Sequence, residues 1–138
     1  MDVVVLIGRV LFVMVFLGSG MTHLSSARAM TGYAQSRGVP AAGVAVPVSG
    51  ALLIVGGLMV LLGIWADLGA LLLVVFLVPT AFLMHAFWKE SDGESRQNEM
   101  VQFMKDLGLA GAALMLFAFF AHVDDLGLII TGPLFSLE

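Results

Sequence analysis

Charged residues divide this chain into long uncharged runs. The runs lie between these charged pairs: Arg9 and Arg28, Arg37 and Asp67, Asp67 and Lys89, and Asp106 and Asp124. Each run is continuously apolar rather than alternating, and each approaches the roughly 20 residues that a helix needs to cross a bilayer core about 30 Å thick. The pattern therefore predicts four membrane-spanning helices, at residues 3–22, 43–66, 68–87 and 101–123.

The connectors between these runs complete the predicted fold. SSARAMTGYAQSRGVP, after the first run, favours a short interfacial helix capped by Ser25 or Ser26 and ended by Gly38 and Pro40. Residues 65–67 predict a tight turn, KESDGESRQNE a polar connector, and the C-terminal tail a segment too short to span. We expect an all-α membrane protein, with four transmembrane helices in an antiparallel bundle and one domain over residues 1–138.

Composition supports a membrane protein. The chain is 60% hydrophobic and 12% charged, with a mean hydropathy of +1.06, whereas soluble domains are about 45 to 50% apolar and about 25% charged. Only Asp2 precedes the first run and Arg9 lies inside it, so we expect a retained helix rather than a signal peptide. The absence of cysteine excludes thiol chemistry and thiolate ligands, and the net charge of −4 gives no reason to expect a nucleic-acid partner.

The cationic residues predict an orientation. They flank the first and third connectors: Arg28, Arg37, Lys89, Arg96 and Lys105. The positive-inside rule then places both termini outside, although Arg9 opposes that bias. We expect a multi-pass protein of a bacterial or archaeal cytoplasmic membrane.

Small residues and one proline predict how the helices pack. Gly50 with Gly57, and Gly56 with Gly63, recur at a spacing of seven, and residues 108–113 are rich in glycine and alanine. In lipid such residues favour close helix contacts. Pro79 followed by Thr80 predicts a kink or a small cavity in the third span, because proline leaves a carbonyl unpaired.

Arg9 is the most deeply placed charge, about six residues into the first span. In an antiparallel bundle it shares an end with Asp67, Asp124 and Asp125, so we expect a structural ion pair with one of these carboxylates. A contact with an anion or a quinone carbonyl is the alternative.

Polar residues also gather at the opposite end. His23, His85, Lys105 and Asp106 are expected there, and His23 shares a helical stripe with Arg9, Phe16 and Gly20. A histidine beside a carboxylate suits hydrogen bonding to a quinone. The candidate residues for a quinone or lipid cleft are therefore Arg9, His23, His85 and Asp106. The alternative is that these are ordinary interfacial side chains. The histidines do not cluster, so we expect no metal or haem site.

Motifs along the whole chain resemble those of the DoxX-like family of small four-helix membrane proteins. The motifs are GRVLFVMVFLGSGMTHL, Tyr33, Gly38-Val39-Pro40, His85-Ala86-Phe87-Trp88, Phe103-Met104-Lys105-Asp106-Leu107 and Ser136-Leu137-Glu138. His23 stands where such proteins usually have lysine, and Asp106 where they often have asparagine. The resemblance implies a four-helix membrane fold and a setting among membrane redox systems.

From these observations we expect an accessory or scaffold subunit beside a quinone-linked respiratory complex, not catalytic alone and with no catalytic residue or cofactor of its own. Its partners would be membrane lipids and a larger redox complex, and quinone or lipid would occupy the cleft. The alternatives are a small stand-alone transporter or lipid-binding protein, which needs a continuous polar path, and an assembly factor whose apolar tail docks on a client.

Overall fold

The computed structural model describes residues 2–123 and 126–136. Regular secondary structure in these residues is helical: α1 (Asp2–Ser25), α2 (Ala27–Ser36), α3 (Ala42–Leu62), α4 (Ala66–Met84), the 3-10 helix η1 (Phe87–Lys89) and α5 (Gly93–His122). Within the described part, α1, α3, α4 continued by η1, and α5 are long and apolar enough to cross a membrane. The predicted all-α fold, with a short helix between the first two spans, is confirmed.

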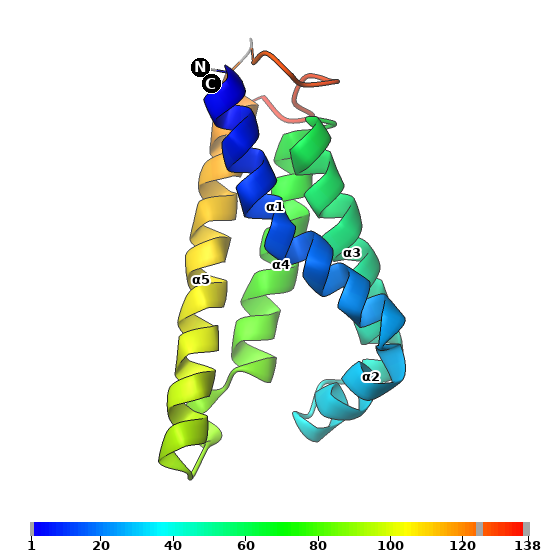
Figure 1. Cartoon of the computed structure of the whole chain (residues 1–138), viewed down its shortest axis with the longest axis vertical. Coiled ribbons are helices and arrows are strands. Elements are labelled where there is room, and N and C mark those ends of the chain that lie inside the picture. Colours follow the sequence, from blue (N-terminus) through cyan, green and yellow to red (C-terminus); the bar gives the residue numbers. More distant parts are fainter. Residues whose placement is uncertain (1, 124–125, 137–138) are drawn as a thin grey trace.

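The long helices pack in a row of neighbours. α1 packs on α3, α3 on α4 and α4 on α5, while α2 packs on α3 and α1. Figure 1 shows that the first turns of α1 and the segment 126–136 lie at one end of the bundle, called here the Arg9 end. The other end, called the His85 end, contains α2, the last turn of α4 and the first turns of α5.

Apolar side chains form the centre of the bundle between these two ends. Leu53, Val60 and Leu73 are fully buried, and Phe16 packs with them. The outward faces are just as apolar: Leu11, Val44, Val75 and Met115 are all more than half exposed. Since lipid tails are as apolar as leucine, such faces suit a bilayer rather than water.

Glycines bring the helices together at two crossings. A Cβ added at Gly20 would lie 2.9 Å from the carbonyl oxygen of Gly50, and one added at Gly69 would lie 2.9 Å from that of Gly56. Close packing was therefore predicted correctly for α3. The prediction is wrong for Gly108 and Gly111, where an added Cβ would meet nothing within 4 Å.

Helix ends differ from the predicted boundaries for local reasons. α3 ends at Leu62 instead of residue 66, because Gly63 adopts the left-handed conformation, with φ 65°, that commonly terminates helices. α5 begins at Gly93 rather than residue 101, since the Asp92 carboxylate accepts a hydrogen bond from Ser95 N at 2.8 Å. That bond lowers the pKa of Asp92. The polar stretch predicted as a connector is thus largely helical.

The C-terminal segment folds back over the turn between α3 and α4. Ile130 N and Thr131 N donate to the carbonyl oxygen of Gly63, at 3.1 and 2.9 Å, and Trp65 N donates to Thr131 Oγ1 at 2.8 Å. The described part of the tail therefore covers the Arg9 end of this chain's own bundle.

Candidate functional site

A cavity of about 510 Å³ opens within the His85 end of the bundle. All five α-helices contribute to its lining. The polar members of the lining are Ser19 and His23 from α1, Tyr33 from α2, Ser49 from α3, Thr80 from α4, His85, and Gln102, Lys105 and Asp106 from α5. Three of the four predicted ligand-binding residues, His23, His85 and Asp106, thus face one space, and Arg9 does not line it.

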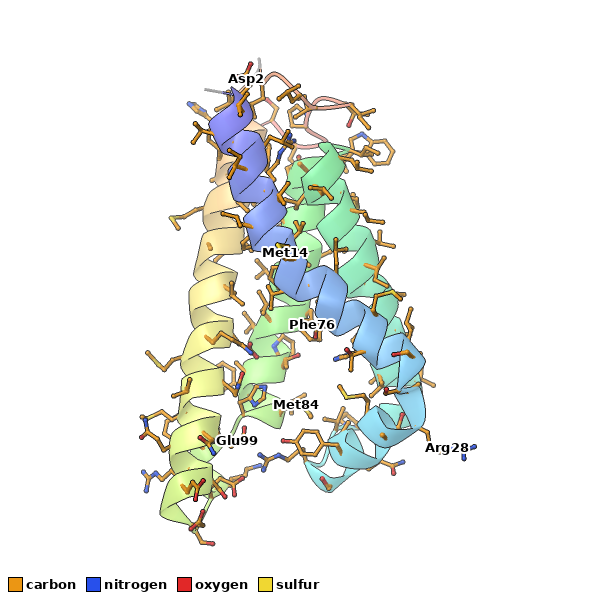
Figure 2. The ribbon with its side chains drawn as sticks, viewed as in Figure 1. Asp2, Met14, Arg28, Phe76, Met84 and Glu99 are labelled. Atoms are coloured by element: carbon orange, nitrogen blue, oxygen red, sulfur yellow. The ribbon has the colours of Figure 1, made fainter. Side chains whose placement is uncertain are left out.

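The cavity exists because the pair formed by α1 and α3 separates from the pair formed by α4 and α5 towards this end (Figure 1). The contact of Gly20 with Gly50 holds α1 against α3, and α2 then turns back and packs on α3 rather than on α5. Pro79 and Thr80 of α4 form part of the wall, as the sequence suggested. Figure 2 labels Phe76 and Met84 on α4, and both line this space.

His85 lies between two carboxylates. Its Nδ1 is 2.7 Å from Glu99 Oε2, and its Nε2 is 3.7 Å from Asp106 Oδ2. Asp106 is only 4% exposed, and within the described residues its Oδ2 has no hydrogen-bond partner. Its other oxygen, Oδ1, lies 3.6 Å from Lys105 Nζ. The site therefore contains a histidine held by one carboxylate and a second, buried carboxylate with an unused acceptor.

His23 forms a separate polar group on the α1 and α3 side of the cavity. Its Nδ1 lies 2.8 Å from Ser49 Oγ, and Ser49 donates its hydroxyl hydrogen to the carbonyl oxygen of Val46, also at 2.8 Å. A serine has a single hydrogen to donate. Ser49 Oγ must therefore accept from His23 Nδ1–H, so a neutral His23 presents its Nε2 as an acceptor. The ring of His23 also contacts that of Phe76, with the centroids 5.9 Å apart.

Arg37 links α2 to the far side of the cavity. Its guanidinium pairs with Glu90 at 2.5 Å and with Glu99, and it lies 5.6 Å from the ring centroid of Tyr33. Tyr33 itself donates to Glu99 Oε1 at 3.3 Å. The bond to Glu90 raises the pKa of Arg37 above its ordinary value, so the guanidinium stays charged.

The sequence does not predict Glu99 or the role of Arg37 at this site. By its pattern Glu99 lies in a polar connector, and Arg37 is one of the charges that indicate orientation. The signal that could have found Glu99 is Asp92, an N-cap residue type, followed by the acidic Glu94 where the first turn of a helix would lie. With α5 begun there, Glu99 falls two turns before Asp106 on the same helix face.

Aromatic rings close the outer side of the same end. Trp88 lies 5.6 Å from Phe103 and 6.3 Å from Phe82, centroid to centroid, so η1 is packed against both α4 and α5. Trp88 and Phe82 are about half exposed. These rings suit the headgroup level of a bilayer, whereas His85 is directed inwards to Glu99.

Arg9 and Asp67 are buried at the other end of the bundle, and both bind the C-terminal segment. Arg9 donates to the carbonyl oxygen of Leu128 at 2.6 Å, and Asp67 Oδ2 accepts from Leu134 N and Phe135 N at 2.8 and 2.7 Å. Among the ion pairs of residues 2–123 and 126–136 there is none between Arg9 and Asp67. The other predicted partners, Asp124 and Asp125, lie outside the described residues.

Comparisons with known proteins agree with this architecture. The family described as DoxX matches residues 4–86, more than half of the chain, a region that contains Arg9, His23 and His85. The inner membrane protein YphA of Escherichia coli (strain K12) is 25% identical over 114 residues, which cover 83% of this chain and 81% of that protein. No solved structure matches the chain.

Proposed function

This chain is an integral membrane protein of the DoxX family, and from that premise we propose that it is an accessory subunit of a quinone-linked membrane redox complex. In this proposal the cavity at the His85 end holds the quinone ring, and a partner enzyme carries out the electron transfer. The chain contains no cysteine, so thiol redox chemistry would also belong to the partner.

The observation that carries the proposal is the composition of the cavity wall. Phe76, Leu52, Leu83 and Met84 supply apolar surface, while His23, His85 and Asp106 supply hydrogen-bonding groups. Ligand sites in proteins are mainly apolar cavities of about 300 to 1,000 Å³ with a few convergent polar groups. A quinone, with a small oxygen-bearing ring on an apolar body, has the same distribution of polarity.

The apolar centre of the bundle favours ligand binding over transport. Between the two polar ends the core consists of side chains such as Leu53, Val60 and Leu73. A transporter would need polar groups to continue along this layer. Lipid binding is therefore the alternative function that the test below distinguishes, and transport is less well supported than either.

The test is to extract the protein from its native membrane in mild detergent and to analyse what accompanies it. Mass spectrometry would identify co-purifying proteins and quantify isoprenoid quinones and phospholipids per protein. We expect roughly one quinone per chain together with a membrane redox enzyme, and at least a severalfold loss of quinone in His85→Leu.

Met115→Leu is the matched control, because Met115 is exposed on the lipid-facing side of α5. Size-exclusion chromatography would establish that both variants remain folded. Recovery of wild-type protein with bulk phospholipid alone would overturn the proposal, and recovery of one specific phospholipid lost in His85→Leu would replace quinone with that lipid as the ligand.

A further inference from the structure

An unused acceptor is buried where a ligand of the cavity would lie. Asp106 Oδ2 has no hydrogen-bond partner among the described residues, and Asp106 is 4% exposed and lines the cavity. Leaving a buried carboxylate oxygen unsatisfied is costly. A ligand that donates a hydrogen to this oxygen removes that cost, and a ligand without such a donor does not.

His85 lies at a distance that leaves room for such a ligand. The separation of 3.7 Å between His85 Nε2 and Asp106 Oδ2 is longer than the roughly 2.7 to 3.2 Å of an N–H···O hydrogen bond. The two groups therefore do not satisfy each other. One ligand oxygen placed to the side can lie about 2.8 Å from both.

The hydrogens of this pair define what that oxygen must be. The Glu99 carboxylate accepts, so His85 Nδ1 carries the hydrogen of that contact. His85 Nε2 is then an acceptor when the ring is neutral, and Asp106 Oδ2 is an acceptor when the carboxyl group is ionised. A hydroxyl can donate to an acceptor of this pair and can itself accept from its neighbour. A carbonyl oxygen only accepts, and it leaves such an acceptor unsatisfied.

A second acceptor faces the same cavity. His23 Nδ1–H is fixed by Ser49, which has already donated its own hydrogen to Val46. The Nε2 of a neutral His23 is then free to accept a hydrogen. Lys105, which also lines the cavity, donates to Gln102 Oε1 at 2.5 Å and lies beside Oδ1 of Asp106 rather than Oδ2.

Resting on the proposed function, we infer that the cavity selects the reduced, dihydroxy form of its ligand, a quinol, over the oxidised quinone. His85 and Asp106 hold one ring hydroxyl, and His23 is the acceptor available to a second. The cavity is thereby a site that retains quinol in the membrane for a partner enzyme that oxidises it.

The test measures the affinity of purified full-length protein in lipid nanodiscs for three probes. They are decylubiquinone, the same compound reduced to decylubiquinol under argon, and the dimethyl ether of that quinol, which has no hydroxyl hydrogen to donate. Isothermal titration gives each Kd. We expect quinol to bind at least about tenfold more tightly than either of the others.

Asp106→Asn should bring the quinol and quinone affinities to within about threefold of each other, since it replaces the carboxylate by an amide that can donate to a carbonyl. Glu94→Gln, which removes an exposed carboxylate from the first turn of α5, should leave the preference unchanged. His85→Gln provides a second variant in case Asp106→Asn does not fold.

The outcomes distinguish a preference for quinol from the binding of a quinone as such. Equal or tighter binding of decylubiquinone overturns the preference for quinol and leaves quinone binding intact. Equal binding of quinol and its dimethyl ether also overturns it, because donation would then contribute nothing. Binding of none of the three probes overturns both.

Discussion

Asp67 is a fully buried carboxylate whose described partners are backbone amides rather than a cation. Its Oδ2 accepts from Leu134 N and Phe135 N. Ionisable groups inside a membrane protein are costly and persist when they pair with one another or with the backbone. Here the carboxylate anchors the C-terminal segment, so its role is structural and lies at the opposite end from the cavity.

Substitution of Asp67 tests this anchoring role. Asp67→Ala removes the acceptor of two part-buried backbone hydrogen bonds, each of which contributes about 0.5 to 1.5 kcal/mol, so we expect a loss of about 1 to 3 kcal/mol in the free energy of unfolding. Limited proteolysis should then cut within residues 126–136 much faster than in the wild type. Asp67→Asn keeps one acceptor oxygen, so its rate of proteolysis should lie between those of the wild type and Asp67→Ala. Unchanged proteolysis in Asp67→Ala would contradict the anchoring role.

At the scale of the helices, glycine determines how closely α3 and α4 approach. A Cβ on Gly69 would lie 2.6 Å from Met59 Cβ and 2.9 Å from the carbonyl oxygen of Gly56. These are backbone and near-backbone atoms, so relief requires the helices to move apart. The short turn after Gly63 joins the same two helices and leaves little freedom for that movement.

Gly69→Ala should therefore destabilise the bundle by about 1 to 3 kcal/mol, the usual cost of overpacking. Gly111→Ala is the matched control, because nothing lies within 4 Å of its added Cβ. In that exposed helical position alanine should be neutral or stabilising by up to about 1 kcal/mol. Unfolding in SDS titrations of the two variants would measure the difference, and equal stabilities would show that the α3–α4 contact can relax.

At the scale of the whole molecule, Arg37 joins the two sides of the cavity. α2 packs on α3 and α1, and its contact with the far side runs from Arg37 and Tyr33 to Glu90 and Glu99. Figure 2 labels Glu99 on α5, across the gap from α2. These charged contacts add to a small apolar contact, in which Met84 of α4 packs against the cluster of Ala34, Ala42 and Val46.

Arg37→Gln should free α2 while barely changing stability, by less than about 1 kcal/mol, because partly exposed ion pairs contribute little. Spin labels on Ser36→Cys and Gln97→Cys would report the distance from α2 to α5, and the native chain has no cysteine to interfere. We expect a broader and longer distance distribution, with faster exchange of any bound ligand.

Arg28→Gln serves as the control for that measurement, since Arg28 lies on the same helix but points away from the bundle (Figure 2). It should leave the distance distribution unchanged. A narrow, wild-type distribution in Arg37→Gln would mean that packing on α3 and α1 is enough to hold α2 in place.

The spanning helices can be predicted from the sequence alone, because a bilayer demands about 20 apolar residues per span and satisfied backbone groups. It also determined that His23, His85 and Asp106 share an end, since helix direction and length follow from the same runs. Helix boundaries failed where single residues decide them, at Gly63 and Asp92.

Which polar groups meet depends on the tertiary structure. It paired His85 with Glu99, and Arg37 with the same carboxylate, over 14 and 62 positions of sequence. Arg9 lies away from the cavity and donates a hydrogen bond to the C-terminal segment instead. Apolar periodicity describes one helix at a time, whereas a site depends on how helices rotate and cross, which the close contacts of Gly20 with Gly50 and Gly56 with Gly69 determine.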